Sequence, residues 1–187
     1  MSPKIGVVLF PGTNCEQDIA WAVERLGAEA VVCWHGDPTV HDVDAIVIPG
    51  GFAHGDYLRT GAIARFSPVM DAVRDFAAQG GPVVGVCNGF QVLTEAGLLP
   101  GALQKNAGLK FLCETVELRV ETDASVLTNR VARGTRLHVP INHFEGNYVC
   151  DGPTLDRLRA EDRVVVRYVE NPNGSLDDIA GICNEGR

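Results

Sequence analysis

Basic clusters are missing from this sequence of 187 residues. Acidic residues outnumber Lys and Arg by 24 to 16, which gives a formal net charge of −8 at neutral pH. Nucleic acids and anionic membranes are recognised through basic faces of a protein. We therefore expect neither among the partners of this chain.

A long apolar run is also missing. The N-terminal run Ile5–Phe10 ends at Pro11, so it is too short for the hydrophobic region of a signal peptide or for a membrane span. We therefore expect a cytoplasmic protein. The hydrophobic content of 45% and the length predict a single domain over residues 1–187.

The six cysteines show no disulfide or metal motif. None forms a C-x-x-C pair, and a disulfide framework is not expected in a chain of this length without a secretory signal. His138 and His143 could begin a metal site, but no Cys or carboxylate has the spacing to complete it, so we predict no metal. Buried, hydrophobic roles are expected for the four cysteines in apolar runs: Cys33, Cys113, Cys150 and Cys183.

The first half of the sequence alternates strand and helix patterns. Strands are predicted at 4–9, 28–34, 44–51 and 83–86, and helices at about 13–26, 67–79 and 88–96. Thr13 followed three residues later by Glu16 matches the capping-box pattern at a helix start. This alternation predicts a doubly wound parallel sheet with functional loops at the carboxyl ends of its strands.

The second half reads differently. "CETVELRVE", "TRLHVPIN", "RVVVRYV" and "DIAGIC" have the composition of strands joined by turns. We expect these strands to join the first sheet, which makes the predicted fold class α/β with a mixed, mostly parallel sheet.

The stretch "PVVGVCNGFQVL", from Pro82 to Leu93, places Cys87 where a strand becomes a helix. Gly85 and Gly89 flank the cysteine by two residues on each side, where a Cβ atom would obstruct a sharp turn. A thiol at a helix N-terminus is favoured as an anion by the helix dipole. The pattern predicts a nucleophile elbow, with a buried structural cysteine beside a tight turn as the alternative.

A second glycine-rich loop, "PGGF" at 49–52, also ends a predicted strand. The Gly51 N–H could lie opposite the N–H of Asn88, and two such donors would form an oxyanion hole. A helix terminus lowers a thiol pKa from about 8.5 by at most about one and a half units, so a histidine base is needed as well. The spacing of the five histidines singles out none of them.

The stretch "GVCNGFQVLTEAGLLPGAL" resembles the nucleophile segment of the class I (triad-type) glutamine amidotransferases. Four more stretches resemble the glutaminase subunits of purine biosynthesis: "FPGTNCEQD", "PGGFAHGDYLRTGAIARF", "PINHFEGNY" and "NPNGSLDDIAGICNEG". The resemblance covers the chain end to end. It implies a flavodoxin-like, three-layer α/β/α fold and hydrolysis of L-glutamine to glutamate and ammonia.

The resemblance also assigns residues. Cys87 would attack the glutamine carboxamide and form a thioester, while the N–H groups of Gly51 and Asn88 hold the oxyanion. Gly50, Gln91 and His143 would lie near the substrate, although His143 can equally be a packed histidine at a strand end.

One departure from the family concerns the triad, whose His and Glu come from a P-H-P-E segment after the stretch matching "DIAGICNEG". The sequence stops at Arg187, before that segment. A strand at 178–183 followed by an open turn should have a return strand, so we expect Arg187 not to be the natural end. We also expect poor turnover from these 187 residues alone.

Activation of an acceptor by ATP is not expected in this chain, because no G-x-x-x-x-G-K-[ST] loop is present. The resemblance implies that a large synthetase subunit uses ATP and Mg, together with a small accessory subunit, and that this chain carries no cofactor. The alternatives are another cysteine-elbow α/β enzyme of the PfpI-like group, or a non-catalytic docking subunit.

Overall fold

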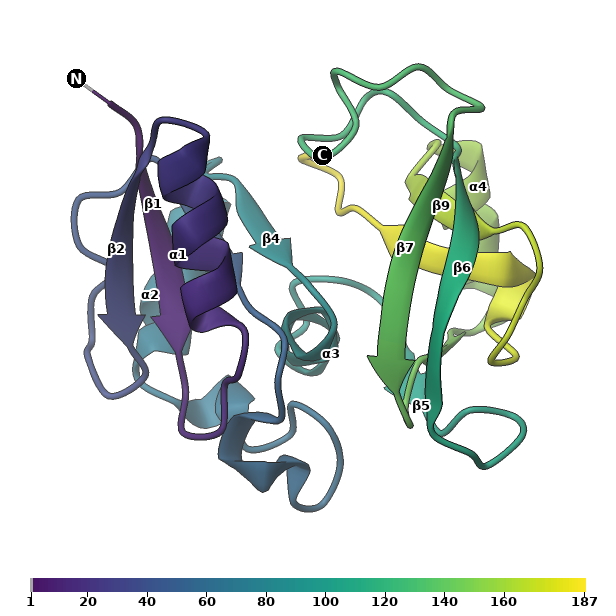
Figure 1. The fold of residues 1–187 in the computed structure, drawn as a ribbon, viewed down its shortest axis with the longest axis horizontal. Helices are drawn as coiled ribbons and strands as arrows, with labels where there is room; N and C mark the ends of the chain where they lie inside the picture. The colour runs from purple at the N-terminus through teal and green to yellow at the C-terminus, as the bar shows by residue number, and fades with distance from the viewer. Residues whose placement is uncertain (1) are drawn as a thin grey trace. The chain divides into compact units, whose positions relative to one another are not determined.

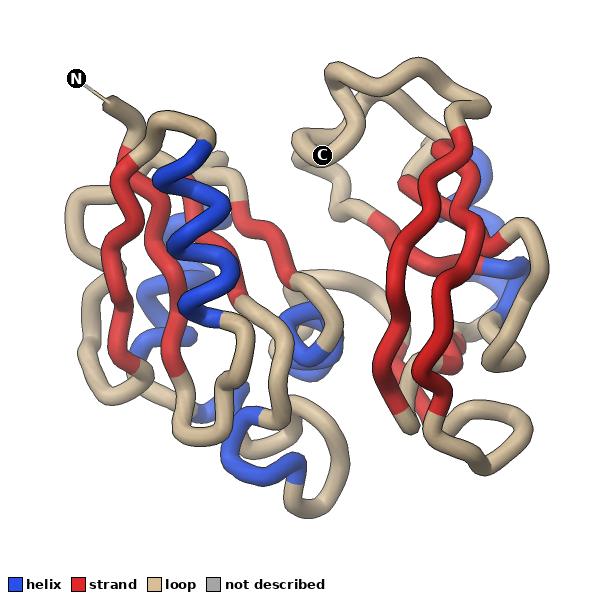
Figure 2. The backbone as a smooth tube through the Cα atoms, in the orientation of Figure 1, coloured by secondary structure: helices blue, strands red, loops and turns tan. Residues whose placement is uncertain are grey.

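Two compact units divide the chain: unit 1 is Met1–Leu98 and unit 2 is Leu99–Arg187. The computed structural model describes residues 2–187. Figure 1 traces the chain through the two units, and Figure 2 shows where helices and strands alternate with loops. Each unit has its own hydrogen-bonded sheets.

Unit 1 is built on a parallel sheet with the strand order β2-β1-β3-β4. Its strands are β1 (Lys4–Leu9), β2 (Glu29–Trp34), β3 (Ala45–Ile48) and β4 (Val83–Gly85). The short apolar runs of β1 and β3 become the centre of the sheet, where both faces are covered and near-continuous hydrophobic sequence is required. All four strands end at the same edge, so the loops that follow them share that edge.

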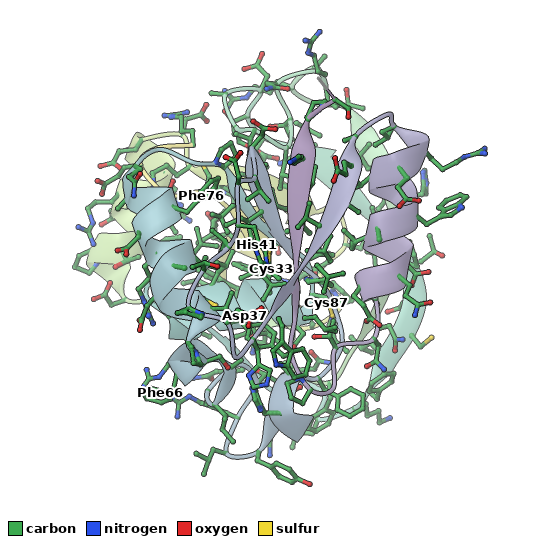
Figure 3. The ribbon with its side chains drawn as sticks, turned by 90° about the vertical axis from the view of Figure 1, so that its left-hand side faces the viewer. Cys33, Asp37, His41, Phe66, Phe76 and Cys87 are labelled. Carbon is green, nitrogen blue, oxygen red and sulfur yellow. The ribbon has the colours of Figure 1, made fainter. Side chains whose placement is uncertain are left out.

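Three helices accompany this sheet: α1 (Glu16–Arg25), α2 (Val69–Ala78) and α3 (Asn88–Glu95). Figures 1 and 3 show α1 on one face of the sheet and α2 on the other. Helix α2 buries Val69, Met70 and Val73, the side chains that its helical periodicity places on one face. The predicted α/β class and parallel sheet are confirmed.

The start of α1 differs from the predicted capping box. The helix begins at Glu16 with Cys15 in the cap position and no side-chain cap. Thr13 is used elsewhere, because its hydroxyl accepts a hydrogen bond from the Phe10 N–H at 3.0 Å and its backbone forms an isolated bridge with Gly51. The Thr13 hydroxyl therefore stabilises the turn after β1, and the predicted capping box is wrong.

Unit 2 contains an antiparallel sheet with the strand order β10-β9-β6-β7. Its strands are β6 (Leu112–Val120), β7 (Arg136–His143), β9 (Val164–Tyr168) and β10 (Ile179–Ile182). In the described residues these strands pair with one another, so the expectation that they extend the first sheet is wrong. Antiparallel strands can be joined by short turns without the crossover helices that parallel pairing requires.

Three elements of unit 2 were not predicted: β5 (Ala102–Gln104), β8 (Asn147–Val149) and α4 (Gly152–Ala160). Strands β5 and β8 pair with each other in a small antiparallel sheet. Helix α4 does carry a start signal, because the Asp151 carboxylate accepts a hydrogen bond from the Thr154 N–H at 2.9 Å.

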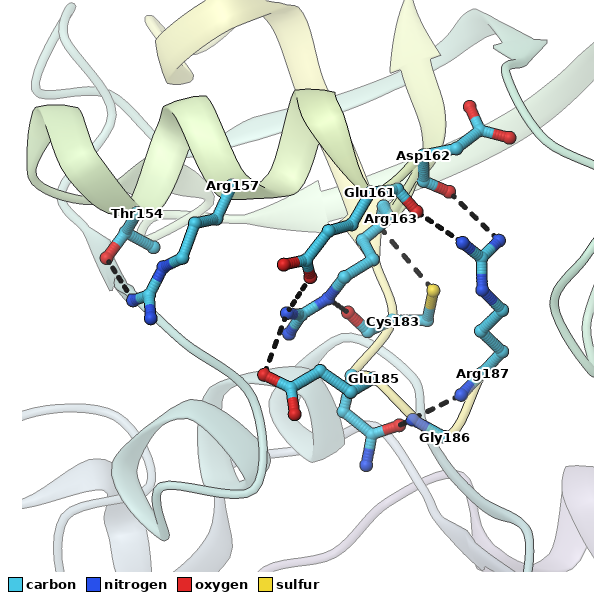
Figure 4. A network of polar contacts seen from close by, with 10 residues as sticks. Thr154, Arg157, Glu161, Asp162, Arg163, Cys183, Glu185, Gly186 and Arg187 are labelled. Atoms are coloured by element: carbon cyan, nitrogen blue, oxygen red, sulfur yellow. Dashed lines mark hydrogen bonds and ion pairs between the residues drawn. The ribbon is translucent and has the colours of Figure 1, made fainter.

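The start of β9 is tied to the segment after β10 by a buried arginine (Figure 4). Arg163 has a side chain that is 8% exposed. Its guanidinium donates to the Cys183 carbonyl at 3.1 Å and pairs with Glu161 at 2.9 Å and Glu185 at 3.4 Å. A buried guanidinium needs such acceptors, because an unpaired buried charge is strongly unfavourable.

Candidate active site

Cys87 lies in the turn between β4 and α3, with φ 54° and ψ −111° (Figure 3). A non-glycine residue with positive φ is uncommon, and holding it there costs on the order of 1–3 kcal/mol. The predicted sharp strand-to-helix turn is therefore present, and its strain falls on the cysteine itself. The residue is exposed to solvent, in contrast to the buried Cys33 and Cys183.

The two glycines beside Cys87 are required by close backbone approaches. A Cβ atom on Gly89 would lie 1.9 Å from the carbonyl oxygen of Ile48, and one on Gly85 would lie 2.5 Å from the carbonyl oxygen of Gly89. Neither contact can be relieved by a side-chain rotation, because both partners are backbone atoms. The glycines let α3 start directly against the end of β3.

The loop after β3 approaches the same point. Gly51 has φ 140°, and a Cβ atom there would lie 2.6 Å from the Asn14 nitrogen. The Gly50 carbonyl accepts hydrogen bonds from the N–H groups of Asn14 and Cys15, both at 3.2 Å. A Cβ atom on Gly50 would lie 3.4 Å from the Cβ of Cys87. This loop therefore passes directly beside the cysteine.

Two backbone donors act on the Cys87 thiol: the N–H of Asn88 and the N–H of Gly51. Although the residue keeps exposed surface, the protein atoms around its sulfur displace water, and this desolvation is the largest influence and raises the pKa of the thiol. The nearby Cys15 and Asp56 raise that pKa further. The two N–H groups oppose this by stabilising the thiolate. The pKa remains raised on balance, so the site holds mainly a thiol and needs a proton acceptor to form the nucleophile.

Asn88, the residue after the nucleophile, is 2% exposed. Its side-chain oxygen accepts the N–H of Ala53 at 2.9 Å, and its side-chain nitrogen donates to Asp56 at 3.0 Å and to Gln91 at 2.9 Å. Gln91, on α3, is 6% exposed. Sequence reasoning did not single out Ala53 or Asp56, although both belong to the "PGGFAHGDYLRTG" stretch.

His143 belongs to unit 2, at the end of β7. Both of its ring nitrogens are buried without a hydrogen-bond partner among residues 2–187, and burial lowers the pKa of the imidazole. The ring packs closely against Gly146, where a Cβ atom would lie 2.3 Å from the ring carbon Cε1.

The remaining cysteines differ from expectation at one position. Cys33 and Cys183 are buried and Cys150 is partly buried, but Cys113 is exposed. Cys113 is the second residue of β6, where the side chain points away from the core despite its apolar neighbours. Among residues 2–187 no group of three or more His, Cys, Asp or Glu side chains could hold a metal ion.

The arrangement defines a class of protein. A strained cysteine after a parallel strand, faced by two backbone N–H groups, can attack an acyl carbon and hold the resulting oxyanion. The family model of the CobB/CobQ-like glutamine amidotransferase domain matches residues 2–187. The chain belongs to this family of glutamine amidotransferases.

Two curated relatives narrow the choice within the family. Both are named "Phosphoribosylformylglycinamidine synthase subunit PurQ", and each match spans 98% of this chain and 84% of the relative's own length. The protein from Koribacter versatilis is 55% identical over 194 residues, and the one from Rubrobacter xylanophilus is 58% identical over 184 residues.

Solved structures agree with this assignment. The structure of PurLQS from Thermotoga maritima has a TM-score of 0.91 and 40% identity, covering all of this chain and 84% of that chain. A putative GMP synthase protein from Thermoplasma acidophilum shares the fold. It is 14% identical, with a TM-score of 0.63 over 90% of this chain and 74% of that chain.

No helix in residues 2–187 is long and apolar enough to cross a membrane.

Proposed function

We infer that this chain is the glutaminase subunit of phosphoribosylformylglycinamidine synthase, which hydrolyses L-glutamine to glutamate and ammonia for purine biosynthesis. The observation that carries this inference is the strained Cys87 with the Gly51 and Asn88 N–H groups directed at its thiol. The similarity to the PurQ proteins, over 98% of the chain, supports the choice of synthase.

In the reaction, the Cys87 thiolate attacks the carboxamide carbon of glutamine and forms a C–S bond. The carbonyl oxygen becomes an oxyanion, held by the N–H groups of Gly51 and Asn88. Collapse of this intermediate breaks the C–N bond, and the amide NH₂ group gains a proton and leaves as ammonia. Water then hydrolyses the thioester to release glutamate and restore the thiol.

The raised pKa of Cys87 explains why a base is needed in this scheme. In the triad of the family, the His of the P-H-P-E segment takes the thiol proton and returns it to the leaving amide nitrogen, while the Glu orients the His. The 187 residues contain no P-H-P-E segment. We propose that turnover needs such a segment, and "the complete subunit" below means a chain that carries it after residue 187.

Three further residues are proposed to face the substrate. Gly50 lies beside the Cys87 side chain, where a Cβ atom would come within 3.4 Å of the cysteine Cβ. Gln91 lies one turn into α3, and its side chain is held by Asn88. His143 has two buried ring nitrogens that a substrate or partner group could satisfy.

The partner is proposed to be the large synthetase subunit, with the small accessory subunit completing the complex. Free ammonia in water is mostly protonated and no longer nucleophilic, so direct transfer to the synthetase favours the reaction. ATP and Mg would act on the synthetase, and this chain would need no cofactor. The proposed location of the complex is the cytoplasm.

Ammonia release from glutamine tests the function, measured in the complete subunit with and without the large synthetase subunit. Release that rises strongly when the synthetase is present is the expected result. Activity independent of the synthetase would instead support another cysteine-elbow enzyme. Complete absence of release with a fully assembled complex would leave only a docking role. Calorimetry on the isolated subunit should show negligible ATP binding.

A further inference from the structure

The Asn88 side chain connects the two loops that supply the proposed oxyanion donors. Gly51 lies two residues before Ala53, whose N–H is bonded to the Asn88 oxygen, and the second donor is the N–H of Asn88 itself. The distance between the two donors therefore depends on how this one side chain is held. A misplacement of about 1 Å at such a site can cost on the order of 10²-fold in rate.

The orientation of the Asn88 amide is fixed by its partners. The Ala53 N–H can only donate, so the Asn88 oxygen must face it, and the Asn88 NH₂ group must face Asp56 and Gln91. An ionised carboxylate can only accept hydrogen bonds. Asp56 therefore allows one orientation of the amide and rejects the flipped one.

Asp56 is itself held at a demanding backbone position. Its φ is 51°, and the two preceding residues, His54 and Gly55, also have positive φ. The carboxylate also accepts the N–H of Gly61 at 3.4 Å, and burial raises the pKa of Asp56. A strained, half-buried carboxylate of this kind persists only where the surrounding structure compensates for its cost.

The loop that carries Asp56 is fastened to α3 at two further points. Arg59 makes a two-pronged ion pair with Glu95 at 2.6 and 2.7 Å. Gly61 approaches the helix backbone so closely that a Cβ atom would lie 2.9 Å from the Gln91 carbonyl carbon. These contacts keep the Asp56 carboxylate in place against Asn88.

We propose that Asp56 is a positioning residue, which locks the Asn88 side chain so that the Gly51 and Asn88 N–H groups converge on the oxyanion. The proposal rests on the glutaminase function proposed above, but it can be tested without glutamine. The negative charge of Asp56 destabilises the Cys87 thiolate and raises its pKa. Asp56 therefore cannot activate Cys87 by electrostatic attraction, because that role would require it to lower this pKa.

The test compares two reagents that modify Cys87 by different routes. With p-nitrophenyl acetate the thiolate attacks a carbonyl carbon, an oxyanion forms, and p-nitrophenolate leaves as the C–O bond breaks. With iodoacetamide the thiolate displaces iodide directly and no oxyanion forms. Both rates are measured across pH on the 187-residue chain, and the background from other thiols is subtracted with Cys87→Ala.

The variants are Asp56→Ala, which removes the acceptor, and Asp56→Asn, which keeps an acceptor oxygen but allows a flipped amide. The matched control is Asp71→Ala, which removes an exposed carboxylate of α2 paired only to Arg74 among the ion pairs of residues 2–187. Circular dichroism establishes that each variant is folded.

Two titratable groups among residues 2–187 influence the charge state of Cys87 in these pH profiles, Cys15 and Asp56.

At pH values where Cys87 is fully ionised, we expect Asp56→Ala to slow acylation about 10- to 100-fold and leave the alkylation rate within a factor of about two. A removed oxyanion donor costs about 10²–10³-fold, and a misaligned pair should cost less. Asp56→Asn should recover part of the loss. Both variants should shift the alkylation midpoint to lower pH, because a negative neighbour is gone.

Equal slowing of acylation and alkylation by Asp56→Ala would overturn the proposal, as would no change in either. Glutamine hydrolysis in the complete subunit with its synthetase provides the second readout, where Asp56→Ala should lower kcat more than it raises KM. If the unsubstituted protein releases no ammonia, the glutaminase function fails while the two-reagent comparison still decides the role of Asp56.

Discussion

The two units of this chain hold neighbouring segments together by different kinds of contact. In unit 1 backbone meets backbone at glycines: Gly89 lies against Ile48 and Gly51 against Asn14. In unit 2 a buried polar side chain joins several segments beside the apolar core: Asn173, with no exposed surface, bonds to Gly146, Tyr168 and Ser175. Unit 1 thereby brings main-chain N–H groups to one point, whereas unit 2 uses its polar groups to hold itself together.

This difference explains why the oxyanion donors are found in unit 1. An oxyanion is best held by donors that do not move during the reaction, and backbone N–H groups in a glycine-packed turn meet that requirement. Substitution of the reacting side chain in unit 1 should therefore change rates, whereas substitutions at packing contacts and polar networks of either unit should change stability. Four predictions test that division, beginning with the largest effect.

Replacing the nucleophile should have the largest effect. Cys87→Ala should reduce ammonia release from glutamine to background in the complete subunit with its synthetase, with an unchanged circular dichroism spectrum. The control is Cys113→Ala, at an exposed thiol in unit 2, which should retain full activity. A limiting amount of a glutamine-analogue alkylator should label Cys87 first, and preferential labelling of Cys15 or Cys113 would contradict the assignment.

Gly89→Ala should be the most destabilising small substitution in unit 1. The added Cβ would lie 1.9 Å from the Ile48 carbonyl oxygen, so we expect a loss of at least about 3 kcal/mol in the free energy of unfolding. Urea unfolding measures the loss. Gly152→Ala is the matched control, because its Cβ would meet nothing within 4 Å at the start of α4, and it should be neutral or stabilising by up to about 1 kcal/mol.

Asn173→Ala should destabilise unit 2 with little effect on the intrinsic reactivity of Cys87. The substitution leaves the Ser175 N–H without its acceptor at 3.0 Å. The Gly146 carbonyl loses the donor at 2.9 Å and keeps only the Ser175 hydroxyl at 3.1 Å among the bonds of residues 2–187. We expect a loss of about 2–3 kcal/mol in urea unfolding. The alkylation rate of Cys87 by iodoacetamide should stay unchanged, and a large drop in that rate would blur the division between the units.

The smallest effect concerns acid stability. The pKa of Asp177 is lowered, mainly by its hydrogen bond to Arg159 and also by Arg167. A depressed pKa in the folded state contributes stability above the unfolded value of about 3.9, and this contribution disappears as the pH falls through the folded pKa. Asp177→Asn should therefore destabilise at about pH 6, and its difference from the unsubstituted chain should shrink as the pH falls below about 3.9. A constant difference across that range would show a non-ionic cause.

Sequence reasoning works best where one local cause acts alone. The continuous apolar run gives β1 its observed bounds, Lys4–Leu9. Gly85 and Gly89 beside Cys87 indicate the turn because only glycine fits there. The alternation of strands and helices then predicts that the functional loops lie at the carboxyl edge of the parallel sheet. These parts of the fold and of the candidate site could be predicted from residue order alone.

The rest depends on contacts between distant segments. Threonine is a common helix cap, but the Thr13 hydroxyl instead accepts a hydrogen bond from the Phe10 N–H. Cys113 has apolar neighbours, yet the strand turns it outward. Asp56 lies 32 residues before Asn88 in the sequence, and no spacing rule joins a loop carboxylate to a helix amide. Such pairings are decided by tertiary packing.

The bond network of Asn88 also has a kinetic consequence. Its side chain joins α3 to the loop after β3 across 35 residues of sequence, so these bonds can form only after both segments have docked. Contacts made late in folding lie beyond the transition state, and weakening them speeds unfolding while folding proceeds at its former rate. We therefore expect the two N–H groups to converge late in folding, after the sheet of unit 1 has formed.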